Sequence, residues 1–458
     1  MSNLKLSVCM IVKNEEKFIE DCLKSVQPVA DQMVVVDTGS TDGTIEIAKR
    51  FGAEVHSFRW IDDFSAARNA SLKYARGQWI LWLDADERLM PESIPVLKDL
   101  LRPERKAVAY LVYIKNIMAD GKNFKISTGH RLFNNFKGIR FQGRIHEQII
   151  YSVARNKGEE RRSNIYLFHL GYGLSPEKQE QKNERNRRLL LQMVGDEPHN
   201  AYAHFTLGQN YLLSNDLQNA LTHYLKALSL KGLDRSLHVN VLNTTAETYL
   251  KLGDLQKAEQ YARQSLQLAP QQVAAYYLMY RIARAANKPQ EAVQRLQKLL
   301  EMNRKSDQMQ RDVSTDIMLD ETDILITLAD LLAEIGQVDE GVSYWYQALQ
   351  KAPDNRAVLE RFLNFLLKTK RWQEALNLID SRPIEQDPAL LDIKGMLQIK
   401  QQDFVGAIQS YARLLQLKPE NTEIVRRLAG LFLKIGQAEK AERLMQMLES
   451  LEQARAVV

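Results

Sequence analysis

Residues 34–44 read VVVDTGSTDGT and residues 78–87 read QWILWLDADE, and these two stretches decide the fold of the first part of the chain. Each begins as a short apolar run rich in β-branched or aromatic residues and breaks off at an aspartate, which is typical of a buried strand. Similar strand-like runs alternate with helical patterns around them, as strands at 6–12, 54–58, 107–114, 125–133 and 165–169 and as helices at 44–51 and 64–76. Strands alternating with helices predict βαβ units and a parallel sheet covered on both faces.

The second part of the chain contains an internal repeat. From residue 201 onward nearly every segment has helical periodicity, and a small residue returns about every 34 positions, at Ala220, Ala258, Ala292, Gly341, Ala375, Ala407 and Ala441. The longer spacing before Gly341 indicates an insertion at residues 303–315. Aromatic residues return around the small ones, and we interpret them as packing positions: Tyr211, Tyr224, Tyr249 and Trp345. The pattern resembles tetratricopeptide repeats (TPRs), helix pairs that stack into a solenoid.

The composition fits a protein with well-formed cores. Hydrophobic residues make up 45% of the 458 residues and the net charge is only +5, which excludes a disordered chain and indicates no nucleic-acid partner. Only Cys9 and Cys22 occur, so we exclude a disulfide-stapled secreted fold and expect both in the core. Because the chain has no signal-peptide pattern and no apolar run near the ~18 residues of a transmembrane segment, we expect a cytoplasmic location.

We expect three parts along the chain. Residues 1–173 form an α/β domain, residues 174–200 a linker helix, and residues 201–458 an all-α superhelix of about seven repeats. A helical second part also explains why the chain has only 21 glycines and 12 prolines.

Four aspartates follow the two deciding strands. Asp37 and Asp42 lie at and behind the end of one strand, and Asp84 and Asp86 follow the other. Because ligands of open α/β sheets bind outside the carboxyl ends of the strands, these carboxylates can converge on one crevice. Asp84 and Asp86 can face one divalent cation, since alternate residues of a strand point the same way. A diphosphate bound there needs that cation, because bare carboxylates repel it.

Other phosphate- and metal-binding motifs are missing from the sequence. It contains no GxxxxGK[ST] loop, and no GxGxxG follows the first strand. DTGSTDG is not a calcium loop, because its sixth position falls on Asp42 where glycine is required. In RIHEQII, Ile150 replaces the second histidine of an HExxH zinc motif.

Three motifs in order give the first part a family resemblance. SVCMIVKNEE at 7–16, VVVDTGSTDGT at 34–44 and FSAARNASLKYARGQWILWLDADE at 64–87 together resemble family 2 glycosyltransferases of the GT-A fold. The resemblance implies a hexosyltransferase-like enzyme that takes sugar from a nucleotide-diphosphate sugar, usually a UDP-sugar. It also implies Mn²⁺ or Mg²⁺ as cofactor and inversion at the anomeric carbon.

The resemblance also implies roles for individual residues. The donor-binding residues are Val12, Lys13, Asn14, Glu15, Asp37, Ser40, Asp42, Arg68, Asn69, Asp84 and Ala85. Within this set Asp37 would accept from uracil, Arg68 would face the base and phosphates, and Asp84 would face the ribose. Asp86 would ligate the metal and act in catalysis, and His169 lies where a late strand can supply a second metal ligand.

The catalytic base departs from the family pattern. Family members usually carry an aspartate, often in a Glu-Asp pair, after the acceptor loop, and this sequence has no such pair there. Its nearest equivalent is GRIHEQI at 143–149, so we expect Glu147 to be the base, with His146 as the alternative. His130, Arg131 and His146 are expected on the acceptor side.

Each assignment competes with a plainer interpretation. Asp37 by itself reads as a turn residue, and His169 as a buried structural histidine. Glu147 reads as a surface ion pair, and the basic run 182–188 as a solvated helix face. The order and register of the three motifs favour the functional interpretation for the aspartates.

We therefore expect a metal-dependent glycosyltransferase whose solenoid groove holds a peptide or protein acceptor. One alternative is an enzyme acting on a cell-surface glycan or a lipid-linked acceptor, with the repeats used for complex assembly. Another is a catalytically silent domain that serves as a scaffold for the repeats. A sugar nucleotidyltransferase would need a glycine-rich phosphate loop after the first strand, where the sequence has MIVKNEE.

Overall fold

The computed structural model describes residues 4–118, 120–170, 176–305 and 315–456. The chain divides into two compact units, Met1–Ile324 and Leu325–Val458. The predicted boundary at residue 173 and most of the predicted insertion at 303–315 lie outside the described residues. The division into a domain at 1–173, a linker at 174–200 and repeats at 201–458 therefore stays a prediction.

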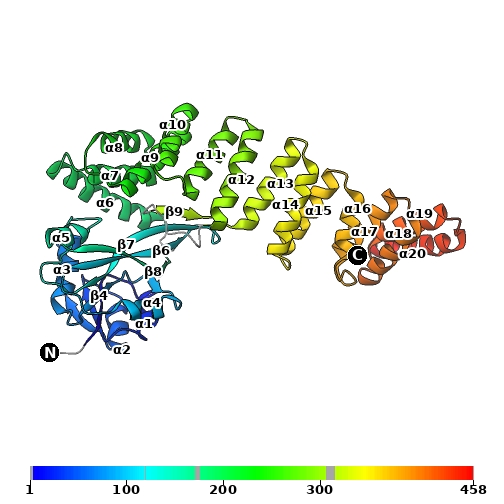
Figure 1. The fold of residues 1–458 in the computed structure, drawn as a ribbon. Helices are drawn as coiled ribbons and strands as arrows, with labels where there is room; N and C mark the ends of the chain where they lie inside the picture. Colours follow the sequence, from blue (N-terminus) through cyan, green and yellow to red (C-terminus); the bar gives the residue numbers. More distant parts are fainter. Residues whose placement is uncertain (1–3, 119, 171–175, 306–314, 457–458) are drawn as a thin grey trace. The chain divides into compact units, whose positions relative to one another are not determined.

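A nine-stranded sheet lies at the centre of the first unit (Figure 1). Its order is β3-β2-β1-β4-β7-β6-β8-β5, with β9 also pairing with β7. The strands are β1 Leu6–Val12, β2 Gln32–Asp37, β3 Glu54–Ser57, β4 Trp79–Trp82, β5 Glu87–Leu89, β6 Val108–Ile117, β7 Phe124–Asn134, β8 Glu159–His169 and β9 Thr315–Met318.

The expectation of a parallel sheet is wrong for part of this sheet. Strands β3, β2, β1 and β4 are parallel, but β7 runs antiparallel to β4, β6 and β9, and β5 runs antiparallel to β8. The reason is connection length: only six residues separate β6 from β7, too few for the crossover that a parallel neighbour needs. The first part is therefore a mixed α/β domain.

Two apolar layers cover the sheet. On one face β1 and β4 pack against α1 (Ile19–Val26), α2 (Thr44–Arg50) and α4 (Ser93–Leu100). On the other face residues of β1, β4 and β7 pack against α3 (Phe64–Tyr74) and α5 (Ile150–Arg155). Cys9 lies in the second layer and Cys22 in the first, both fully buried, which confirms them as core residues.

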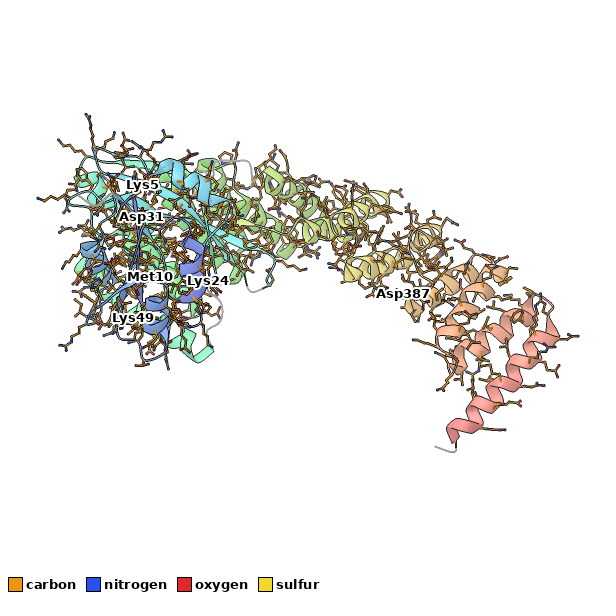
Figure 2. All side chains as sticks on the ribbon, turned by 90° about the horizontal axis from the view of Figure 1, so that it is seen from below. Lys5, Met10, Lys24, Asp31, Lys49 and Asp387 are labelled. Atoms are coloured by element: carbon orange, nitrogen blue, oxygen red, sulfur yellow. The ribbon has the colours of Figure 1, made fainter. Side chains whose placement is uncertain are left out.

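The register of the central strands aligns their carboxyl ends. Asp31 fixes the start of β1, since its Oδ2 accepts from the backbone N–H of Lys5 at 2.8 Å and of Leu6 at 2.9 Å (Figure 2). Val12 then lies opposite Asp37, so β1 and β2 end side by side. Gly77 lies just before β4 and packs closely against β1. A Cβ at position 77 would lie 2.5 Å from the backbone nitrogen of Ser7.

The rest of the described chain is helical except for β9. Helix α6 (Pro176–Asp196) leads into seven successive helix pairs, which fits the expected all-α repeat region. These are α7 Ala201–Leu213, α8 Leu217–Ser229, α9 Arg235–Lys251, α10 Leu255–Leu268, α11 Val273–Ala285, α12 Pro289–Lys305, α13 Glu321–Glu334, α14 Val338–Lys351, α15 Arg356–Lys368, α16 Trp372–Asp380, α17 Pro388–Lys400, α18 Phe404–Leu417, α19 Thr422–Lys434 and α20 Ala438–Ala456. In the described ranges, none of these helices combines the length and the apolar character needed to cross a bilayer.

Small and aromatic residues pack the helix pairs as the repeat pattern predicts. A Cβ on Gly208 of α7 would lie 2.6 Å from the Tyr224 ring of α8. The same fit recurs in the second unit, where a Cβ on Gly395 of α17 would lie 2.7 Å from the Tyr411 ring of α18. The aromatic Tyr224 and Trp345 are buried, which confirms that they belong to the core of the solenoid.

The close fit of Gly395 against Tyr411 predicts the effect of adding one methyl group at position 395. We expect Gly395→Ala to lower the free energy of unfolding by about 1–2 kcal/mol, because overpacking against Tyr411 outweighs the gain in helix propensity. Gly430 of α19 is the matched control, since its Cβ would meet no atom within 4 Å. There alanine should raise stability by up to about 1 kcal/mol. Calorimetric unfolding of both variants checks the prediction, and equal effects would contradict it.

Strand β9 ties the repeats to the sheet and lies next to β7 in Figure 1. It pairs with the first half of β7, from Phe124 opposite Met318 to Ser127 opposite Thr315. The buried Asp316 accepts from the backbone N–H of Val273 at 3.1 Å and of Ala274 at 2.8 Å, at the N-terminus of α11. The first helix pairs therefore belong to the same compact unit as the sheet.

Candidate functional site

The loops after β1 and β2 bind each other at the carboxyl edge of the sheet. Asn14 has a left-handed backbone (φ 58°), and its N–H donates to Ser40 Oγ at 2.9 Å. The Asn14 side-chain oxygen accepts from the N–H of Thr41 at 2.7 Å, and the Glu15 N–H donates to Thr44 Oγ1 at 2.8 Å. These bonds hold the predicted donor residues Asn14, Glu15 and Ser40 in one rigid rim.

Asp37 and Asp42 shape the second of these loops. The Asp37 carboxylate accepts from the backbone N–H of Gly39 and Ser40 at 3.0 Å, and the side chain is buried. Asp42 accepts from the N–H of Thr44 at 3.1 Å and of Glu16 at 3.3 Å. Both aspartates thus order the turn of the predicted donor site.

Five alternating charges form an ionic chain beyond β4. It runs Glu147, Arg68, Asp84, Arg131, Glu87. Arg68 pairs with Glu147 and lies 3.7 Å from Asp84, while Arg131 donates to Asp84 at 2.8 Å and to Glu87 at 2.6 Å. The two terminal glutamates are almost fully buried, with exposed side-chain fractions of 4% for Glu147 and 2% for Glu87.

The ring of Trp82 packs against the two arginines of this ionic chain. The guanidinium carbon of Arg68 lies 3.4 Å from the ring centre, and that of Arg131 lies 5.1 Å from it, so both cations face the ring. Arg131 reaches this place because it is the extra residue of a β-bulge: Leu132 lies opposite Tyr110 and His130 opposite Leu111. Bulges next to active sites commonly re-aim a side chain in this way.

The charges shift the pKa values of the carboxyl groups in opposite directions. Burial alone would raise the pKa of Asp84, but Arg131 and Arg68 outweigh it and hold that pKa below its usual range. Burial raises the pKa of Glu87 to about 6, and it also raises the pKa of Glu147 against the attraction of Arg68. Glu15 has a pKa near 7, raised by burial and by repulsion from Asp86 and Asp84. The loop after β1 therefore faces the same charges.

Arg131 keeps this arrangement stable, and its removal is predicted to be costly. We expect Arg131→Met to lower the free energy of unfolding by about 3 kcal/mol, because it leaves Glu87 buried without a counter-ion. The loss should shrink as the pH falls from 8 to 5, because an unpaired Glu87 takes up a proton. Chemical unfolding at both pH values measures the difference. Arg140→Met, at an exposed arginine, is the control and should stay within about 0.5 kcal/mol.

Asp86 and His169 face each other across β5 and β8. His169 Nε2 lies 3.0 Å from Asp86 Oδ2, and Nδ1 lies 2.7 Å from the side-chain oxygen of Asn116. The Asn116 amide nitrogen donates to the carbonyl oxygens of Ile114 and Lys125 and to Ser127 Oγ, which fixes its oxygen toward His169. His169 Nδ1 must therefore carry a proton.

This tautomer directs Nε2 of His169 at a carboxylate. Neutral His169 would point a lone pair at Asp86 Oδ2, so a proton or a cation has to lie between the two atoms. Although burial lowers it, the pKa of His169 is raised overall by the bond to Asp86 and by the charges of Asp86, Glu87 and Asp84.

The pair fits a divalent cation bound together with a diphosphate. In the described part of the chain no group of three or more His, Cys, Asp or Glu side chains is arranged to hold a metal. Mg²⁺, however, is usually held by one or two protein ligands, several waters and the substrate phosphates. Asn116 would orient the histidine, as hydrogen-bonded partners of metal-binding histidines commonly do.

Glu147 lies in a tight turn of residues 142–148. The backbone N–H groups of Gln142 and Gln148 each donate to the other's carbonyl at 2.9 Å, which closes the turn. His146 is exposed and has a left-handed backbone (φ 54°). Such strained residues cluster at functional sites. The turn brings Glu147 to Arg68, so it joins the predicted base to the predicted donor residues.

The remaining predicted residues lie around this centre. Asn69 Nδ2 donates to the Phe141 carbonyl at 3.0 Å, and Asn69 Oδ1 accepts from the Phe141 N–H at 2.8 Å, so Asn69 anchors the turn. His130 pairs with Glu160 of β8 at 2.7 Å, and Arg131 belongs to the ionic chain. Their expected place on the acceptor side stays a prediction. Ala85 and Val12 are buried, and Lys13 is exposed.

The sequence patterns did not predict three residues of the site, Glu87, Trp82 and Asn116. Glu87 directly follows DAD, and an acid so close to a buried strand was a usable signal. Trp82 and Asn116 gave none, because an aromatic residue in an apolar strand and an asparagine in a strand are both ordinary.

Comparison with known proteins agrees with this geometry. Residues 7–159 match the family model described as glycosyl transferase family 2. This part of the chain is a family 2 glycosyltransferase domain. Tetratricopeptide repeat models match residues 201–232, 249–311 and 398–457, so both resemblances seen in the sequence are confirmed.

One curated relative is named for its TPR repeats and another is named as a glycosyltransferase. A TPR repeat-containing protein of Synechococcus elongatus is 34% identical over 261 residues, covering 56% of this chain and 64% of that protein. The glycosyltransferase SunS of Bacillus subtilis is 28% identical over 231 residues, covering 48% of this chain and 52% of SunS. The chain thus spans about half the length of SunS and slightly less than two thirds of the Synechococcus protein. A solved tetratricopeptide repeat protein of Parabacteroides merdae covers 56% of this chain and 94% of its own, at 19% identity and a TM-score of 0.33.

Proposed function

We propose that the protein is an inverting glycosyltransferase that moves a sugar from a nucleotide-diphosphate sugar, with UDP-sugars as first candidates, to a polypeptide acceptor. The observation that carries the proposal is the convergence of Asp86, His169 and the ionic chain at the carboxyl edge of a family 2 domain. Carboxylates and guanidinium groups gathered there can hold a diphosphate, a metal and a reacting hydroxyl or amide in one place.

The rim formed by the loops after β1 and β2 would bind the nucleotide. Asp37 and Ser40 order the loop backbone, and Arg68 lies over Trp82 where it can approach the phosphates. Its guanidinium has two carboxylate neighbours, so it would meet the donor already oriented.

Asp86 and His169 would hold Mn²⁺ or Mg²⁺. When bound, the cation neutralises charge that builds up on the leaving diphosphate. Asp86, His169 and Asn116 would act by fixing the ligand atoms before the donor arrives, which is preorganisation of the electrostatic field.

Glu147 would be the general base of a single displacement. It would take the proton of the acceptor nucleophile while the nucleophile bonds to the anomeric carbon and the carbon–phosphate-oxygen bond breaks. The raised pKa of Glu147 suits a group that must accept a proton near neutral pH. Arg68 would limit the position of the carboxylate before transfer.

The solenoid supports a polypeptide acceptor, because stacked helix pairs form extended grooves that suit extended chains. A glycan or lipid-linked acceptor is the second candidate. The test compares the full chain with residues 1–320, which keep β9 and the helix pairs α7–α12 with the sheet.

We expect the shortened chain to keep hydrolysing the nucleotide sugar within about threefold, because the catalytic residues lie in the first unit. Transfer to polypeptides from a cell lysate should fall at least tenfold, as measured by mass spectrometry of the modified chains. Unchanged transfer to polypeptides, or transfer only to glycans or lipids, would contradict the polypeptide assignment. A cut at residue 200 is unsuitable, because it would remove β9 from the sheet.

A further inference from the structure

The turn that carries Glu147 contacts the first helix of the solenoid. Gln148 Nε2 donates to the hydroxyl oxygen of Tyr202 on α7 at 3.2 Å, and the Tyr202 hydroxyl lies 3.5 Å from the carbonyl oxygen of His146. Burial raises the pKa of Tyr202 to about 12, so the hydroxyl keeps its proton and can donate to that carbonyl.

The contact is placed at a strained peptide. The left-handed His146 directly precedes Glu147, and this conformation persists only where its surroundings hold it. The Tyr202 hydroxyl and the Gln148 amide both lie within hydrogen-bonding distance of the His146 carbonyl. The orientation of the peptide before Glu147 therefore depends on a side chain outside the α/β domain.

Apolar packing holds the same turn from the side of the solenoid. Ile145, 4% exposed, packs in one buried cluster with Leu189 and Leu190 of α6 and Leu207 of α7. Helices α6 and α7 lie next to each other above the sheet in Figure 1. Phe64, the first residue of α3, packs against the same cluster, and its N–H donates to the Arg144 carbonyl at 2.8 Å. The turn is thus fixed between α3, which carries Arg68, and the first repeat.

We propose that Tyr202 is a positioning residue of the active site: the first tetratricopeptide helix sets the turn that aims Glu147 at the acceptor. The inference rests on the proposed function, in which Glu147 is the base, and it gives the first repeat a catalytic task separate from acceptor binding. A side chain that merely stabilised the contact between α7 and the turn would affect folding and donor binding together, whereas a positioning residue affects transfer alone.

The test is Tyr202→Phe in the full chain, which removes only the hydroxyl group. We expect kcat for transfer to fall about tenfold, the effect of one hydrogen bond that holds a catalytic group in place. The KM for the nucleotide sugar and the Kd for UDP with Mn²⁺ should change less than twofold. Backbone amides in peptides covering residues 142–148 should exchange hydrogen about tenfold faster, while peptides from β1 and β2 stay unchanged.

Tyr74→Phe is the matched control, because Tyr74 is an exposed tyrosine at the end of α3, outside both the proposed donor site and the solenoid. It should leave kcat and the exchange of residues 142–148 unchanged. The proposal is overturned if Tyr202→Phe leaves both quantities within twofold, or if kcat, UDP binding and exchange throughout the first unit all change together. If the unmodified protein transfers no sugar, the proposed function fails, and the exchange of residues 142–148 still decides whether Tyr202 holds the turn.

Discussion

Replacing Asp86 by alanine is expected to reduce sugar transfer by about 10³-fold or more while the protein stays folded. The side chain is 28% exposed and its hydrogen-bonded partner is His169, so little packing is lost. What disappears is the carboxylate that would hold the cation against the departing diphosphate. His169 would keep its orientation through Asn116 but would face no second ligand atom.

The measurement is the release of nucleoside diphosphate by the unmodified protein and by Asp86→Ala at saturating Mn²⁺. Calorimetric titration with UDP and Mn²⁺ should show that metal-dependent binding is also lost. Asp99→Ala serves as the control, since Asp99 is an exposed aspartate of α4 and should leave turnover unchanged. Full turnover by Asp86→Ala would remove this residue from the metal site.

Replacing Glu147 by glutamine is expected to reduce transfer to the acceptor by about 10²–10⁴-fold, the usual contribution of a general base. Glutamine has nearly the same shape and can place its side-chain oxygen beside the Arg68 guanidinium, so the turn should persist. Donor binding should change little, because the residues of the nucleotide rim are untouched. The variant therefore separates the acceptor step from the donor step.

Two measurements check this separation: UDP affinity in the presence of Mn²⁺, and the rate of transfer in single turnover. We expect affinity within about threefold of the unmodified protein, together with the large loss in rate. Glu92→Gln, at an exposed glutamate beside α4, controls for loss of a carboxylate alone. If Glu147→Gln transfers sugar at the normal rate, the base lies elsewhere and Glu147 serves only as the buried partner of Arg68.

The sequence was informative where a strand pattern and a motif coincide. QWILWLDADE predicted both a buried strand and acids at its end, and the structure places Asp84 and Asp86 in the short loop between β4 and β5. The repeat was equally predictable, because each helix pair needs the same small and aromatic residues in the same order. The family resemblance added the order of the motifs, which the match at residues 7–159 confirms.

Other features depend on contacts that no local pattern encodes. The bulge that aims Arg131 at Asp84 arises from how β6 and β7 pair, and both strands are ordinary in sequence. Strand β9 has only four residues and pairs with β7, almost 200 positions earlier in the chain. For the same reason the sequence connected neither Arg131 with Asp84 nor Tyr202 with the turn that carries Glu147.

The most direct test of the account is donor turnover with and without a divalent cation. The purified full chain is incubated with a panel of uridine and guanosine diphosphate sugars, and released nucleoside diphosphate is measured with Mn²⁺, with Mg²⁺ and with excess EDTA. The account predicts that at least one sugar nucleotide is turned over with metal and that EDTA abolishes the release. No turnover of any donor, together with no metal-dependent binding of UDP or GDP, would contradict it and leave the domain as a scaffold for the repeats.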